Sequence, residues 1–92
     1  MTDEDKLDAI HEVAQDIIGY LNRNIEYHRF TYETQDVREA VGVVGVTVYD
    51  RNDRSFLVTY TGRSWDEVIG KMLCTRNALT LAYRSGCMMR DA

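Results

Sequence analysis

The 92-residue sequence contains no proline, and no apolar run in it is long enough for a transmembrane helix. Without proline there is no rigid hinge or Pro-rich linker to favour a second domain. A membrane-spanning helix needs about 20 consecutive apolar residues, so we expect no contact with a bilayer. The chain begins with the acidic segment Met-Thr-Asp-Glu-Asp, whereas a secretory signal begins with a basic one. We therefore expect a cytoplasmic protein of one domain, residues 1–92.

The sequence also lacks the residue spacings of common catalytic and ligand sites. Neither Cys-x-x-Cys nor His-x-x-x-His occurs, so no zinc site is indicated. Gly42 and Gly45 are followed by neither a Lys-Ser nor a Lys-Thr pair, which a phosphate-binding loop needs. Cys74 and Cys87 are separated by about 18 Å of helix, too far for a disulfide, and Cys74 is predicted to lie in the core. We expect no enzyme activity, no cofactor and no metal.

What is present is a clear pattern of helices and strands. Apolar residues at spacings of three and four predict a helix from about residue 3 to 21, capped by Thr2 with Asp5. Residues 25–34 are predicted as a strand and 35–40 as a loop. Alternating residues predict strands over 42–49 and 56–61, joined by the polar hairpin loop 50–55.

The last predicted element is a helix from about residue 65 to 85. Ser64 and Glu67 form a capping box before it, and Gly86 is placed to end it as a left-handed cap. The predicted fold class is therefore α+β, helix-strand-strand-strand-helix, with a three-stranded antiparallel sheet and both helices on one face. Residues 86–92 are predicted to form a C-terminal tail.

Charge is distributed unevenly along the chain. Residues 1–16 contain six acidic residues and one lysine, whereas residues 17–92 contain ten basic and nine acidic residues. One interpretation is a solvated helix face whose first turn is filled with acids that favour the helix dipole. The other is an acidic surface that docks on a basic patch of a protein partner or of a second copy. The predicted protein-binding residues are Asp3, Glu4, Asp5, Asp8, Glu12 and Asp16.

The sequence contains more apolar residues than are needed to form a core between one face of the sheet and one stripe on each helix. The first helix and the loops cover the surplus in one interpretation. In the other, an exposed apolar patch serves a partner or a second copy, and we expect a homodimer. The residues of this predicted dimer surface are Val41, Val43, Tyr49, Leu57, Met88 and Met89.

The order of elements and the segment 62–79 resemble a known fold. The residues 62–64 (GRS), followed by Lys71, Arg76 and 77–79 (NAL), are similar in layout to the last strand and second helix of the double-stranded-RNA-binding domain. The segment 65–79 (WDEVIGKMLCTRNAL) also resembles small uncharacterised bacterial and phage-borne domains with that fold. The resemblance implies binding to duplex RNA through basic residues at the start of the second helix. This sequence departs from the family there, because it has Asp66 and Glu67 at that position.

Two functions follow as expectations. The one we favour is a small, acidic, non-enzymatic protein-binding module, and more narrowly a phage-type inhibitor of a host or defence protein that occupies a basic surface. The alternative is a domain that binds duplex RNA or DNA, for which phosphate neutralisation by basic residues is required. The basic residues available for that alternative are Arg51, Arg54, Arg63, Lys71 and Arg76.

Overall fold

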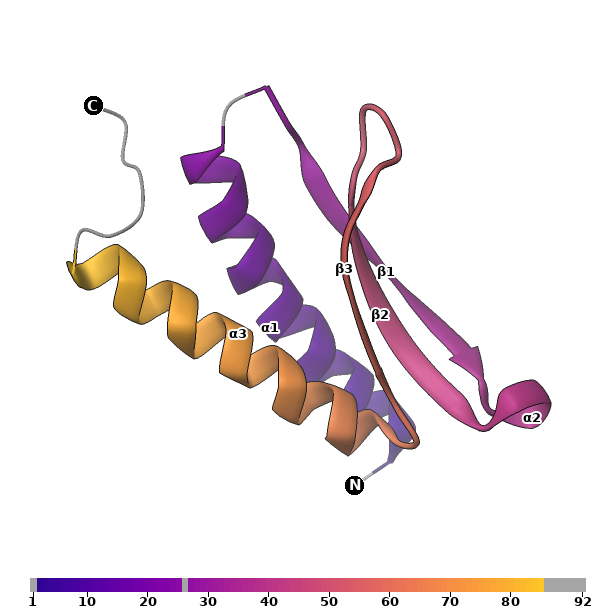
Figure 1. The fold of residues 1–92 in the computed structure, drawn as a ribbon. Coiled ribbons are helices and arrows are strands. Elements are labelled where there is room, and N and C mark those ends of the chain that lie inside the picture. The colour runs from indigo at the N-terminus through magenta and orange to yellow at the C-terminus, as the bar shows by residue number, and fades with distance from the viewer. Residues whose placement is uncertain (1, 26, 86–92) are drawn as a thin grey trace.

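The computed structural model describes residues 2–25 and 27–85 and shows two long helices on one face of a three-stranded antiparallel sheet (Figure 1). The strand order is β1-β2-β3, so neighbours in sequence are neighbours in the sheet. The predicted α+β fold class is confirmed. The elements are α1 (Asp3–Asn24), β1 (Phe30–Val37), α2 (Arg38–Val41), β2 (Val43–Asp50), β3 (Phe56–Gly62) and α3 (Trp65–Ser85).

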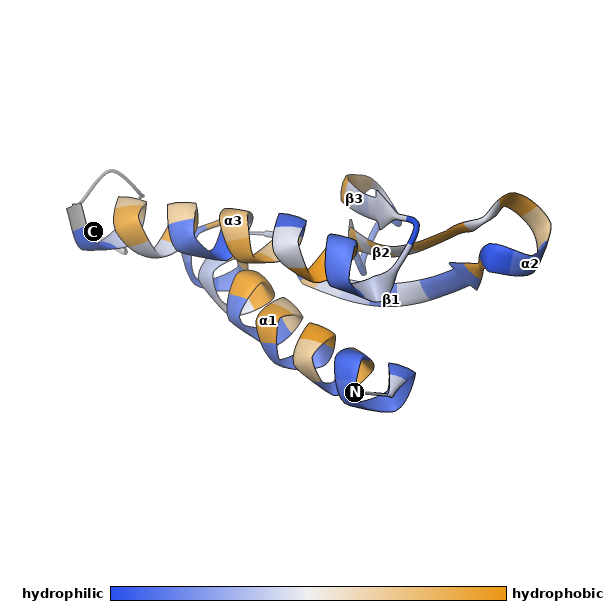
Figure 2. Cartoon of the chain, turned by 90° about the horizontal axis from the view of Figure 1, so that it is seen from below, coloured by the Kyte–Doolittle hydropathy of each residue, from blue (hydrophilic) through white to orange (hydrophobic). Residues whose placement is uncertain are grey.

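The first helix begins with the predicted capping box. The Asp5 amide donates to Thr2 Oγ1 (3.2 Å), and the Thr2 amide donates back to an Asp5 carboxylate oxygen (3.3 Å). These bonds satisfy two backbone donors that would otherwise have no partner in the first turn. Figure 2 shows the hydrophobic residues of α1 on the side toward α3 and the hydrophilic ones on its outer side. The helix is therefore held by its cap and by one buried stripe.

The third helix begins in a different way from the predicted capping box. The Glu67 amide donates to Ser64 Oγ (3.3 Å), as expected. The Glu67 carboxylate, however, accepts from the Arg63 amide (2.7 Å), one residue further back than the predicted partner. It fits there because Gly62 has no side chain, and a Cβ at Gly62 would overlap the Glu67 side chain. The predicted cap at Gly86 lies outside the described residues.

The first strand lies further along the chain than predicted, over Phe30–Val37 and not 25–34. Its start is determined by Asn22, whose side chain accepts from the Phe30 amide (2.7 Å) and donates to the Phe30 carbonyl (3.2 Å). Its end is determined by pairing, since β1 stays in register with β2 up to Val37 opposite Val43. The predicted loop at 35–40 is therefore partly strand, followed by the helical turn α2 and by Gly42 at φ +75°.

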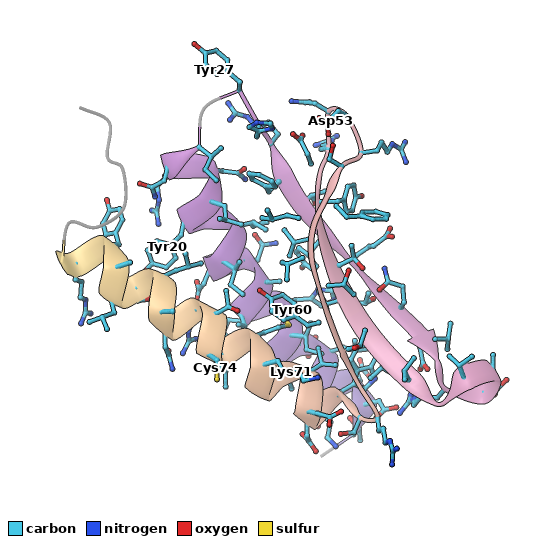
Figure 3. All side chains as sticks on the ribbon, viewed as in Figure 1. Tyr20, Tyr27, Asp53, Tyr60, Lys71 and Cys74 are labelled. Atoms are coloured by element: carbon cyan, nitrogen blue, oxygen red, sulfur yellow. The ribbon has the colours of Figure 1, made fainter. Side chains whose placement is uncertain are left out.

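The core lies between the helix pair and the sheet. Both helices run in the same direction, because Lys6 pairs with Asp66 near their N-terminal ends and Thr80 donates to the Tyr20 hydroxyl (3.1 Å) further along. Figure 3 shows Tyr20 between the two helices. The sheet contributes mainly β2, which crosses the centre of the core. The buried apolar residues are Ile10, Val13, Ala14, Ile17, Phe30, Val44, Val46, Val48, Tyr60, Trp65, Val68 and Met72.

The prediction that Cys74 lies in the core is wrong. The buried side of α3 is formed by Trp65, Val68 and Met72, at spacings of three and four. Two residues after Met72 the helix has turned by about 200°, so Cys74 lies on the outer side. The side chain is exposed, as Figure 3 shows. The broad apolar arc of this helix in the sequence hid which of its sides faces the core.

Candidate binding surfaces

The six acidic residues predicted on the first helix are all exposed, but three of them have structural partners. Asp3 accepts from Arg38 (2.8 Å), Asp5 belongs to the cap, and Asp16 lies 3.6 Å from Arg76. Arg38 also bonds Asp36 (2.7 Å), and these hydrogen bonds lower the pKa of the Asp36 carboxyl. Asp3 and Asp16 therefore connect α1 to other elements, and Asp5 stabilises the first turn of α1.

The other three predicted acidic residues, Glu4, Asp8 and Glu12, have no hydrogen-bond or ion-pair partner among the described residues; we call them the acidic row. Their spacing of four places them on one side of α1, opposite the buried Ile10 and Val13. The helix dipole favours acids only within the first turn, so it accounts for Glu4 and not for Asp8 and Glu12. Like charges four residues apart also destabilise a helix slightly. The stability of the fold therefore does not explain Asp8 and Glu12.

The five basic residues predicted as one patch are divided among three places. Arg63 precedes α3, and Lys71 donates to the Thr61 carbonyl (2.6 Å) at the same end of the sheet. Arg76 is the partner of Asp16. Arg51 and Arg54 lie in the β2–β3 hairpin loop, at the opposite end from Lys71, as the labels of Lys71 and Asp53 in Figure 3 show. The arrangement predicted for duplex binding is thus not assembled as one surface.

The end of the molecule at the β2–β3 loop combines exposed arginines with exposed aromatic side chains. The α1–β1 connection lies beside this loop, since the Arg51 amide donates to the Arg29 carbonyl (2.7 Å). Figure 3 shows Tyr27 and Asp53 at this same end. We call this surface the hairpin-tip surface and define it by the exposed residues Tyr27, Arg29, Arg51, Arg54 and Phe56.

Beneath the hairpin-tip surface a buried carboxylate holds the loop together. Asp50, 3% exposed, bonds the His28 imidazole through Nδ1 and accepts from the Asn52 amide (2.8 Å). The hydrogen bond from His28, followed by that from the Asn52 backbone, lowers the pKa of the Asp50 carboxyl. Because the carboxylate is an acceptor only, Nδ1 of His28 carries the proton. The ring of His28 stacks on Phe30, with centroids 5.8 Å apart.

On the sheet face away from the helices, the predicted dimer residues do not form one patch. Val41 is the last residue of α2 and Val43 the first of β2, whereas Tyr49 and Leu57 lie near the hairpin loop at the other end of the sheet. Between them β2 presents Gly45 and Thr47, so the centre of this face is polar. The Thr47 hydroxyl donates to Gln35 (3.2 Å) and lies 3.2 Å from the Thr59 hydroxyl. Met88 and Met89 are outside the described residues, and the homodimer stays a prediction.

The same face is hollowed next to the hairpin loop. The hollow has a volume of about 180 Å³ and is lined by Glu33, Tyr49, Arg54 and Phe56. Phe56 pairs with Tyr49 across the strands at a shift in register, which brings the two rings into one depression. Sequence reasoning did not single out Tyr27, Arg29 or Phe56, because alternation assigned them to strands and gave no sign of their exposure.

Within the described part of the chain, no three His, Cys, Asp or Glu side chains are grouped so that they could hold a metal ion. None of the helices described there combines the length and apolar character of a membrane span. Comparison of the sequence with protein-family models and curated proteins, and of the fold with solved structures, finds no match.

Proposed function

We propose that the chain is a non-enzymatic binding module that docks on a basic surface of a partner protein through the acidic row of α1. The observation that carries the proposal is the pair Asp8 and Glu12. Both are exposed, both lack a partner among the described residues, and neither is accounted for by the helix cap or the dipole. Electrostatic complementarity of this kind steers association and selects the partner.

In its narrower form, the proposal is that the module is an inhibitor. A helix face carrying carboxylates about 6 Å apart along its axis presents a row of negative charge to a surface that otherwise binds nucleic acid. Occupation of that surface would exclude the nucleic acid without any chemistry by the module. The predicted acidic side chains are already exposed, so binding requires no rearrangement of α1.

The test compares two charge-reversed variants in a pull-down from a nuclease-treated lysate, quantified by mass spectrometry. In the first, Asp8→Lys and Glu12→Lys reverse two charges of the acidic row. In the control, Glu39→Lys and Asp53→Lys make the same change in net charge at exposed positions outside α1. We expect a basic protein to be captured by the wild type and the control variant and lost by the first variant.

Two further results decide whether the module acts as an inhibitor. The captured protein should lose its own nucleic acid when the wild-type module is added, and the Asp8/Glu12 variant should leave that complex intact. If both variants capture the same proteins in the same amounts, the acidic row is a solvated helix face and the proposal is wrong.

A further inference from the structure

The hairpin-tip surface has features that the proposed function does not use. Its three arginines have no carboxylate partner among the described residues; Arg29 donates only to the His28 carbonyl (3.2 Å). Of the described acids near these arginines, Asp50 bonds His28, Asp53 accepts from the Ser55 amide (2.9 Å), and Glu33 in the adjoining hollow accepts from Gln35 (3.1 Å). Three guanidinium groups are therefore free to contact an anionic ligand such as a phosphate.

Two aromatic rings accompany these arginines. Tyr27 is 90% exposed and Phe56 is 75% exposed, the two highest values among the large apolar side chains described. Such rings usually lie at least half buried, so their exposure beside arginines indicates a ligand with flat faces. Nucleobases have such faces, and phosphates alternate with them along a strand. Base stacking on aromatic side chains with arginine at the backbone is how single strands are bound.

The backbone holds two of these side chains in an unusual conformation. Tyr27 (φ +68°) and Arg54 (φ +65°) are the only described residues other than glycine with positive φ. This region is disfavoured for bulky residues, and the conformation persists only where surrounding contacts impose it. At Arg54 the contact is its own amide donating to the Asp50 carbonyl (2.8 Å). The turn that presents Arg54 is therefore fixed by this hydrogen bond.

The hollow beside Arg54 matches the edge of a base. Glu33 lines this hollow together with Tyr49 and Phe56, and one of its carboxylate oxygens accepts from Gln35 (3.1 Å) while the other has no hydrogen-bond partner among the described residues. A carboxylate accepts from the exocyclic amino group of cytosine, whereas it repels phosphate. A base on the rings with its amino edge toward Glu33 and its phosphate toward Arg54 satisfies all four residues.

From these observations we infer that the hairpin-tip surface, with the adjoining hollow, binds a short segment of single-stranded nucleic acid. A duplex does not fit the same features, because its stacked bases offer no free face to Tyr27 and Phe56. The site lies at the opposite end of the sheet from the start of α3, and the acidic row has no part in it.

The test is fluorescence anisotropy at low salt, with a labelled oligocytidine of about 12 nucleotides, within the range of known single-strand sites, and its duplex as probes. One variant removes the rings, Tyr27→Ala with Phe56→Ala. Another removes two charges, Arg51→Gln with Arg54→Gln. The matched control makes the same charge change at exposed positions elsewhere, Arg63→Gln with Arg84→Gln. Circular dichroism checks that each variant is folded.

We expect the single strand to bind more tightly than the duplex, and loss of both rings to weaken its binding by about thirtyfold or more. Loss of Arg51 and Arg54 should reduce the slope of log affinity against log salt by about 0.7 for each arginine, while the control stays close to wild type. Amide shifts in the NMR spectrum should map to 27–33 and 49–56. Equal affinity of the ring variant and the wild type, preference for the duplex, or no binding at low salt would overturn the inference.

Discussion

The two ends of the molecule differ in how their charged side chains are used. At the end where α1 and α3 begin, Asp3 and Asp36 share Arg38, Lys6 bonds Asp66, and Glu67 holds the Arg63 amide. At the hairpin end, one carboxylate is buried beneath the surface and the arginines above it have no acidic partner among the described residues. The paired charges at the first end stabilise the junction of three elements, and the acidic row of α1 is the unpaired charge on that side, whereas at the second end all three arginines lack an acidic partner among the described residues.

The two ends also differ in how many of their exposed charged residues already have a structural role. The acidic character of the N-terminal helix is conspicuous in the sequence, but half of its predicted binding residues already have structural roles. The hairpin end is nearly neutral in the sequence, yet its arginines and rings are the exposed groups with least structural explanation. Net charge of a segment is therefore a poorer guide to a binding surface than the number of its charges that lack partners.

A substitution in the core, which both ends share, should lower the stability of the protein the most. Met72 is fully buried between α3 and the sheet, so Met72→Ala should lower the free energy of unfolding by about 2–5 kcal/mol. Leu81→Ala, on the same helix but 69% exposed, should change it by less than about 0.5 kcal/mol. Urea unfolding of both variants measures the difference, and equal losses would show that the described core is wrong.

A smaller loss of stability is expected from a substitution at the end where α3 begins. In Gly62→Ala the new Cβ displaces Glu67 and breaks its bond to the Arg63 amide, which should lower the free energy of unfolding by about 1–2 kcal/mol, as loss of a helix cap does. Gly70→Ala is the matched control, because open space surrounds Gly70 within the helix. It should stabilise the protein by about 0.5–1 kcal/mol. Thermal unfolding that shows the same sign for both variants would contradict the role of Glu67.

At the hairpin end, Asp50→Asn should loosen the loop and lower the unfolding midpoint by less than Gly62→Ala does. The reason is that the carboxamide oxygen of the variant can still accept from the Asn52 amide, but it no longer holds a charge-assisted bond from His28. The pKa of the Asp50 carboxyl is lowered from 3.8 in the folded state. Its contribution is thus fully present above about pH 4 and is lost as pH falls through the folded pKa.

Unfolding measured from neutral to acidic pH tests whether the stabilising contribution of Asp50 is lost as the pH falls. The midpoints of the wild type and the Asp50→Asn variant should differ most near neutral pH and converge below the folded pKa of Asp50. Asp53→Asn, in the same loop but exposed, serves as the control and should show little difference at any pH. A gap between wild type and Asp50→Asn that widens as the solution is acidified would refute the assignment.

The sequence predicted the elements whose signals are local. The caps at Thr2 and Ser64 and the alternation along β2 gave α1, β2 and α3 nearly in place. The first strand was misplaced because Asn22 determines its start through two side-chain bonds and distant pairing determines its end. No local propensity encodes either contact.

For the candidate surfaces, the sequence predicted which charged residues lie on each surface, but not which of them form ion pairs with other elements. The exposure of the acidic side chains followed from helical spacing, while the bonds of Asp3 and Asp16 join elements far apart in the chain. The exposure of Tyr27 was hidden because its turn, with φ +68°, interrupts what looked like a continuous strand. Alternation placed Tyr27 in the predicted strand 25–34 without deciding which face it occupies, and the structure shows it exposed before that strand begins.

The smallest loss of stability should come from Arg38→Gln, which removes the ion pair with Asp3 of α1 and the ion pair with Asp36 at the end of β1. Arg38 lowers the pKa of Asp36 by hydrogen bonding, so its stabilising contribution exists above about pH 4 and is lost as Asp36 protonates. Both partners are exposed, and exposed ion pairs are weak and screened by salt. The unfolding midpoint should therefore fall slightly at low salt and neutral pH, and the difference should vanish in high salt or in acid. A large loss that persists in high salt would show that the Arg38 ion pairs are neither weak nor screened, contrary to this expectation.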